Sequence, residues 1–178
     1  MHETRNELPY DARLQMVRLL NARLADAIDL RTQVKVAHWN VKGPEFIALH
    51  KLFDDVASDV DQYVDLIAER AVQLGGSAEG TARQVAEKSS LDEYAGTGSA
   101  EQHVPAVADA LADFGKSARQ AIDSASDAGD QDTADIFTEV SRGVDKWLWM
   151  VEAHLQAGAW SHVAASGEGE AGRHPPQH

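Results

Sequence analysis

The chain of 178 residues contains no cysteine, which excludes disulfides, cysteine-bound zinc and thiolate catalysis. Basic residues are scarce: 16 Lys and Arg stand against 29 Asp and Glu, so the formal net charge is −13. This balance disfavours a surface that binds nucleic acid broadly, because such binding depends on neutralised phosphates. It suits a protein that attracts cations, although an acidic protein that is merely soluble has the same composition.

Long apolar runs are also missing. No run approaches the roughly 18 residues that indicate a membrane span, and the first residues lack the apolar segment of a secretory signal. The length fits one domain with a core of ordinary size. We therefore expect a soluble, cytoplasmic protein with no membrane partner.

Four long segments carry apolar residues at intervals of three and four, which predicts four helices and no strand. The first helix opens near Pro9 and runs to about Asn40. The second follows the Gly43-Pro44 break, since proline suits a first helical turn, and it ends at Gly75-Gly76. Its apolar stripe comprises Phe46, Leu49, Phe53, Val56, Val60, Val64, Ile67, Ala71 and Leu74.

A long polar connection leads to the second pair of helices. It covers residues 77–99, and we expect it to carry a short helix around Leu91–Tyr94. Ser99 is the expected cap of the third helix, and Gly129-Asp130 marks the turn to the fourth. Two helices, a long crossover and two more helices describe an all-α protein with a ferritin-like four-helix bundle.

The composition divides the chain into three parts. Residues 1–9 form a short N-terminal tail, residues 10–157 the bundle, and residues 158–178 a C-terminal tail rich in Gly, Ser, His and Pro. The last part contains His162, His174 and His178, which either bind metal weakly or are solvated side chains without a role.

Metal-ligating side chains gather around the Gly43-Pro44 break and along the second helix. Imidazole and carboxylate together are the ligand set of iron, manganese or zinc. Asp54 and Asp65 are eleven residues apart, so they share a helix face at about 16 Å, and one ion cannot touch both. Either they are unrelated, or a second copy of the helix completes the site. The candidate ligands are His38, His50, Asp54, Asp65 and Glu69.

Each of these residues has a simpler interpretation. The second helix can be a solvated acidic face with an incidental histidine, although its like charges repel one another and a cation would offset that repulsion. His38 can be a packed residue, yet the tight turn brings it near His50. Trp39 is a core or interface anchor, or a sacrificial electron donor beside a metal that consumes peroxide.

Other chemistries find little support in the sequence. Ordinary di-iron bundles use Glu-x-x-His inside the bundle, and this motif does not occur. There is no P-loop and no zinc-protease motif, and the glycines near residue 97 lack the third glycine of a dinucleotide fingerprint.

Parts of the sequence closely resemble the Dps family, ferritin-like proteins known as DNA-binding proteins of starved cells. The resemblance lies in AHWNVKGPEFIALHKLFDD, in the VDLIAER that follows it, and in GDQDTADIFTEVSRGVDKWLWMVEAHLQ. The resemblance covers about residues 10–157. It implies a hollow homo-oligomer, a dodecamer, with iron-oxidising sites shared across a two-fold axis. His38, His50 and Asp54 would come from one chain, and Asp65 and Glu69 from its partner.

The resemblance also implies an activity, that of a ferroxidase. Fe(II) would be oxidised, preferably by hydrogen peroxide, and the ferric mineral stored in the shell, which protects the cell from oxidative damage. A site would have room for two irons, and zinc or manganese could occupy it instead. Asp130 and Asp135 would line an iron-entry pore, unless the acidic residues at this helix start simply favour its dipole.

The alternative function is a nucleoid-structuring protein that compacts DNA. Many family members bind DNA through a lysine-rich terminal tail. Here residues 1–9 offer only Arg5 and the last 21 residues only Arg173. We therefore expect weak or absent DNA binding, with nucleoid association as the alternative to a free cytoplasmic location.

Overall fold

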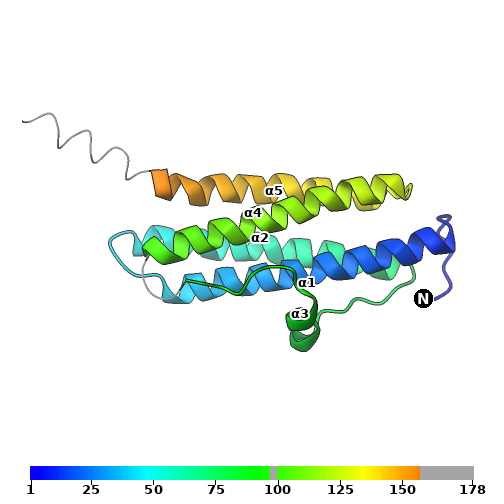
Figure 1. The fold of residues 1–178 in the computed structure, drawn as a ribbon, viewed down its shortest axis with the longest axis horizontal. Coiled ribbons are helices and arrows are strands. Elements are labelled where there is room, and N and C mark those ends of the chain that lie inside the picture. The colour runs from blue at the N-terminus through cyan, green and yellow to red at the C-terminus, as the bar shows by residue number, and fades with distance from the viewer. Residues whose placement is uncertain (97–99, 157–178) are drawn as a thin grey trace, which may run out of the picture.

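The computed structural model describes residues 1–96 and 100–156, and in this part of the chain it contains helices and no strand. Figure 1 shows two antiparallel helix pairs, α1 with α2 and α4 with α5, stacked into an elongated four-helix bundle, with the short α3 outside the bundle on the crossover. The predicted all-α bundle with a long crossover is therefore confirmed. The helices are α1 Tyr10–Asn40, α2 Phe46–Gln73, α3 Ala82–Lys88, α4 Ala100–Asp127 and α5 Gln131–Gln156.

The core forms where the four apolar stripes meet. Phe53 of α2, Phe114 of α4 and Phe137 of α5 are fully buried, together with leucines of α1. Burying one such side chain stabilises the fold by about 1.5–3 kcal/mol. The predicted stripe of α2 is buried over most of its length, but Phe46 at its start is 38% exposed.

The short helix of the crossover lies elsewhere than predicted. It spans Ala82–Lys88, whereas residues 91–94 are not helical. A capping box between Thr81 and Gln84 starts it, and Ser90 beyond its end bonds to the buried Asp26 of α1 through both its backbone N–H and its hydroxyl. These side-chain bonds to α1 hold the chain extended where the sequence pattern had predicted a helix.

The N-terminal segment lies against the far end of α2. Gly75 ends this helix with a positive φ of 85°, and its carbonyl accepts the N–H of His2 at 2.5 Å. Arg13 donates to the carbonyls of Leu8 and Leu74, which joins the start of α1 to the same place. The predicted domain boundaries stay predictions, and Ser99, the tail 158–178 and its histidines lie outside the described residues.

Candidate metal centre on the α1–α2 hairpin

Two histidines face each other where α1 ends and α2 begins. The rings of His38 and His50 are stacked with 3.7 Å between centroids, and each Nδ1 lies 2.8 or 2.9 Å from the backbone carbonyl oxygen of the other residue. A carbonyl oxygen can only accept, so in the neutral ring Nδ1 carries the proton and Nε2 keeps its lone pair. Both imidazoles are therefore held in the tautomer and orientation that bind metal through Nε2.

The local sequence explains this pairing. Gly43 turns the chain with a φ of 115°, and the buried Val41 anchors the turn to the core. A connection of five residues between Asn40 and Phe46 keeps the two helices antiparallel and in contact. The register then sets residue 38 opposite residue 50, as the sequence predicted.

Asp54 lies one helical turn beyond His50. Its Oδ1 is 3.9 Å from Nδ1 of His38 and accepts a hydrogen bond from Nζ of Lys35 at 2.7 Å. This bond, and then the charge of Lys35, lowers the pKa of Asp54 below its usual value. The structure thus brings three of the predicted residues, His38, His50 and Asp54, to one end of the hairpin.

The two remaining predicted ligands lie elsewhere in the same chain. Asp65 and Glu69 are exposed on α2, and Asp65 is about three turns, or 16 Å, from Asp54. Within residues 1–96 and 100–156 of this single chain, no three histidine or acidic side chains converge on one metal position. One chain alone therefore presents two separate groups of candidate ligands.

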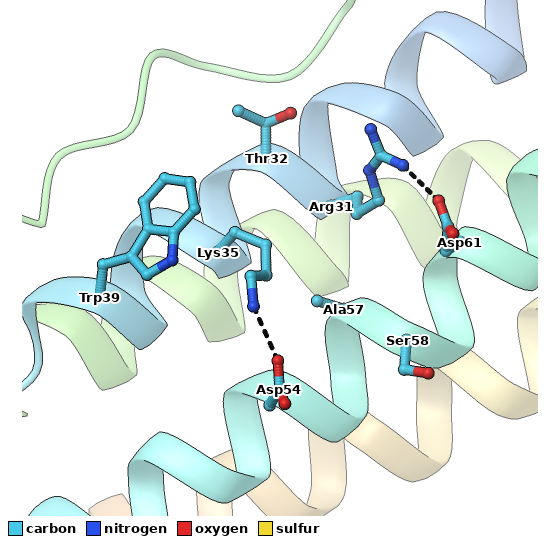
Figure 2. Close-up of a pocket in the computed structure, with 8 residues that line it drawn as sticks. All are labelled: Arg31, Thr32, Lys35, Trp39, Asp54, Ala57, Ser58 and Asp61. Carbon is cyan, nitrogen blue, oxygen red and sulfur yellow. Dashed lines mark hydrogen bonds and ion pairs between the residues drawn. The ribbon is translucent and has the colours of Figure 1, made fainter.

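An open cleft between α1 and α2 adjoins the histidines. Figure 2 shows Lys35 and Arg31 of α1 reaching across it to Asp54 and Asp61 of α2. Trp39 stands at its rim, 65% exposed, with its ring centroid 5.9 Å from Nζ of Lys35. The cleft has a volume of about 440 Å³ and is lined by Arg31, Thr32, Lys35, Trp39, Asp54, Ala57, Ser58 and Asp61.

The acidic start of α5 makes side-chain contacts that the sequence did not predict. The carboxylate of Asp130 is buried, and its Oδ1 is 2.6 Å from Nη2 of Arg70. The same carboxylate accepts the backbone N–H and the hydroxyl of Thr133, so it caps α5 and joins it to α2. Of the two residues predicted for iron entry, Asp130 is thus engaged within the fold, and Asp135 is exposed.

Sequence reasoning overlooked Lys35 and Arg70. Each stands next to a predicted ligand group, Lys35 one turn before His38 and Arg70 directly after Glu69. For Arg70 the sequence offered a signal, because this basic residue directly follows Glu69 on an acidic helix, whereas no acidic residue lies within five positions of Lys35. Only the structure says which carboxylate each one contacts.

Comparison with known proteins agrees with this architecture. The model of the ferritin-like domain family matches residues 17–159. The DNA protection during starvation protein of Agrobacterium fabrum is 44% identical over 156 residues, which cover 87% of this chain and 96% of that protein.

Two solved structures have the same fold. A Dps structure from Mycobacterium smegmatis superposes with a TM-score of 0.81 at 28% identity, covering 86% of this chain and 94% of that one. A Dps protein from Vibrio cholerae O1, described as a member of a broad superfamily of ferritin-like diiron-carboxylate proteins, gives 0.81 at 22% identity over 87% and 98%, a likeness of fold alone.

The matched family model and the bundle define a ferritin-like protein. Within this class, the chain belongs to the Dps family. None of the helices in the described part of the chain has the length and apolar character needed to cross a membrane.

Proposed function

We propose that this protein oxidises Fe(II) with hydrogen peroxide and stores the ferric product inside a hollow homo-oligomer, a dodecamer. The observation that carries the proposal is the histidine pair: the Nδ1 atoms of His38 and His50 are both occupied by backbone carbonyls, which leaves two Nε2 lone pairs for an ion. Two histidines that only pack in a core do not need both Nδ1 atoms bonded to backbone carbonyls.

The metal centre is shared between two copies of the chain. His38, His50 and Asp54 of one copy meet Asp65 and Glu69 of the partner subunit when two α2 helices pack antiparallel about a two-fold axis. The separation of about 16 Å along one helix supports this arrangement, because one ion cannot reach both groups of candidate ligands in a single chain. Each pair of chains then forms two equal centres.

Iron is the substrate at these centres. Two Fe(II) give two electrons to one hydrogen peroxide, which takes up two protons and leaves as two water molecules, so no hydroxyl radical is released. The imidazoles hold the ion, and the carboxylates favour Fe(III), the more highly charged product. Zinc or manganese fits the same nitrogen and oxygen ligands and would compete with iron.

Trp39 stands beside the centre and acts as an electron donor when peroxide meets too little iron. Its 65% exposure at the rim of the cleft supports this role, and Trp149, also 65% exposed but on α5, is the matched control. After iron and excess peroxide, mass spectrometry should find oxidised Trp39 well before oxidised Trp149. Equal oxidation of the two would leave Trp39 as an interface anchor.

Iron enters at the start of α5. Asp132 is 81% exposed in its side chain and Asp135 is exposed, so both can concentrate Fe(II) at low salt. Asp130 contributes by holding this helix start in place through Arg70. Replacing Asp135 by Asn should slow mineral growth, and the slowing should shrink at high ionic strength.

The experiment that tests the function is anaerobic loading with Fe(II), followed by peroxide in a stopped-flow instrument that records ferric absorbance. His50→Ala and Glu69→Ala chains should each lose the fast phase. Asp61→Asn is the control, because Asp61 lies on the same helix and pairs with Arg31. Unimpaired oxidation by His50→Ala would refute the proposed site.

Mixing tests the sharing. Assemblies reconstituted from equal amounts of His50→Ala and Glu69→Ala chains should recover about a quarter of the wild-type rate, because half of the pairs are hybrids and each hybrid has one intact centre of two. A mixture that stays as slow as either variant would contradict the shared site.

The second candidate function, DNA compaction, has less support. The first nine residues offer one cation, Arg5, against Glu3 and Glu7, and the whole chain has a net charge of −13. Phosphate binding requires clustered Lys and Arg. We therefore propose that DNA protection, the role named for the Agrobacterium relative, rests here on iron and peroxide chemistry.

A further inference from the structure

We propose that Tyr94 and His103 form a reversible electron-donor site, in which Tyr94 gives an electron to oxidised Trp39 and passes its phenolic proton to His103. The inference rests on the proposed function, in which Trp39 supplies an electron when peroxide meets too little iron. It goes beyond that function because neither Tyr94 nor His103 is a proposed metal ligand, and because the pair would repair the indole that peroxide has oxidised.

The two side chains meet where the crossover reaches the start of α4. The hydroxyl oxygen of Tyr94 lies 2.6 Å from Nδ1 of His103, and the two rings are stacked with 6.0 Å between centroids. His103 is fully buried and Tyr94 is half-buried. The backbone of Gly96 covers the hydrogen bond, since a Cβ added there would lie 2.5 Å from the hydroxyl and 2.8 Å from Nδ1. The contact is therefore short and closed off on this side.

Burial determines which of the two groups holds the proton. It raises the pKa of Tyr94 to about 12, so the phenol keeps its proton, and it lowers the pKa of His103, so the imidazole is neutral at neutral pH. The phenol therefore donates, Nδ1 accepts, and Nε2 carries the proton of the neutral ring. Among the described residues, this buried Nε2 has no hydrogen-bond partner. An unpaired buried group calls for an explanation, and a redox role is one.

The hydrogen bond supplies the base that oxidation of a tyrosine needs. A phenol that loses an electron becomes a strong acid, and Nδ1 of His103 at 2.6 Å is within reach of its proton. In the step, one electron passes from Tyr94 to the oxidised indole of Trp39, the O–H bond of Tyr94 breaks, and an N–H bond forms at Nδ1. The indole takes up that electron and one proton from water. The imidazolium is a costly buried charge, so its proton returns to Tyr94 when Fe(II) later reduces the radical.

The surface of α1 connects the pair with Trp39. Figure 1 shows the chain after α3 running along α1, and Tyr94 lines a cleft of about 530 Å³ there together with Thr32 and Val36. Thr32 also lines the cleft at the metal centre, and Val36 lies about one helical turn before Trp39. The two rings therefore lie along the same stretch of α1, which favours electron transfer between them.

The chain offers matched controls. It has three tyrosines, and Tyr63 is 8% exposed, with a pKa raised by burial and then by the charges of Asp59 and Glu139. In the described part of the chain it is thus a buried tyrosine beside carboxylates, without a histidine bonded to its hydroxyl. His103→Gln is the second control, because the amide oxygen can accept the phenolic hydrogen bond but cannot take up the proton.

The test is electron paramagnetic resonance on the full assembly, frozen rapidly after limiting Fe(II) and excess hydrogen peroxide. We expect a tyrosyl radical, recognised because ring-deuterated tyrosine narrows its spectrum. Tyr94→Phe and His103→Gln should both lose this signal, and Tyr63→Phe should keep it. Mass spectrometry should find more oxidised Trp39 in Tyr94→Phe than in the wild type, because the indole is no longer repaired.

The outcomes separate the two proposals. Ferric absorbance without a tyrosyl radical, or a full tyrosyl signal in Tyr94→Phe or in His103→Gln, would overturn the inference while leaving the metal centre in place. The absence of iron oxidation in the wild type would overturn the proposed function, and the inference with it. If both variants fail to assemble, the double variant Tyr10→Phe/Tyr63→Phe decides the matter. Tyr94 is then the only tyrosine left, and loss of the tyrosyl signal would refute its role.

Discussion

Replacing Asp130 by alanine should destabilise the protein far more than its place in an acidic helix start suggests. The substitution leaves the buried guanidinium of Arg70 without its close carboxylate partner, since Arg70 and Asp130 are 5% and 2% exposed, and only the exposed carboxylate of Asp132 remains, at 3.5 Å. Removing one partner of a buried pair costs about 3–5 kcal/mol. Loss of the cap on Thr133 costs about 0.5–2 kcal/mol more, although the two effects share one carboxylate and do not add fully.

The assay is urea unfolding followed by circular dichroism at a fixed chain concentration, because assembly adds to apparent stability. Asp130→Ala should lower the free energy of unfolding by about 3–5 kcal/mol with an unchanged slope. Asp132→Ala is the matched control, since its side chain is 81% exposed in the same helical turn, and it should cost less than about 0.5 kcal/mol. A loss below about 1 kcal/mol for Asp130→Ala would refute the structural role of the pair.

Three further predictions concern other parts of the molecule. Lys35→Gln should raise the pKa of Asp54 towards its usual value in a carbon-detected NMR titration, because the contact with Lys35 is what lowers this pKa. The stabilisation by the pair is present above the pKa of Asp54 in the unfolded chain and disappears as the pH falls through the lowered pKa of the folded protein. An Asp54 pKa that does not change in Lys35→Gln would contradict the contact. Gly143→Ala should cost about 1–3 kcal/mol in thermal or urea unfolding, because the added Cβ would lie 1.8 Å from the hydroxyl of Tyr63, and Tyr63→Phe should recover part of the loss. The assembled protein should not shift linear DNA at about 0.15 M salt, since every chain adds a net charge of −13, and binding that weakens with added salt would favour DNA compaction instead.

The sequence predicted the structure best where one physical requirement, such as the burial of an apolar stripe, determines the local fold. Apolar spacing located the four long helices, because each must bury one stripe, and Gly43 and Gly75 marked two of the turns, where both adopt a positive φ. The spacing of Asp54 and Asp65 along α2 predicted either unrelated carboxylates or a site that a second copy of the helix completes, and this choice stays a prediction. The opposition of His38 and His50 followed from the short turn between the helices.

Contacts between distant polar side chains could not be predicted in the same way. The buried Asp26 is bonded to Ser90, a residue 64 positions away, and this fixes the extended course of the crossover after α3. No local sequence pattern predicts such a bond, so the short helix was predicted in the wrong place. Likewise, the carboxylates that Lys35 and Arg70 contact lie 19 and 60 positions away in the sequence, and only the packing of the helices brings each pair together.

The helix α2 is fastened at both ends, by the reciprocal histidine bonds at its start and by the pair of Arg70 with Asp130 near its end. In the proposed subunit pair, the fixed length of α2 would therefore set the distance between the two shared centres, at about 16 Å along the helix axis.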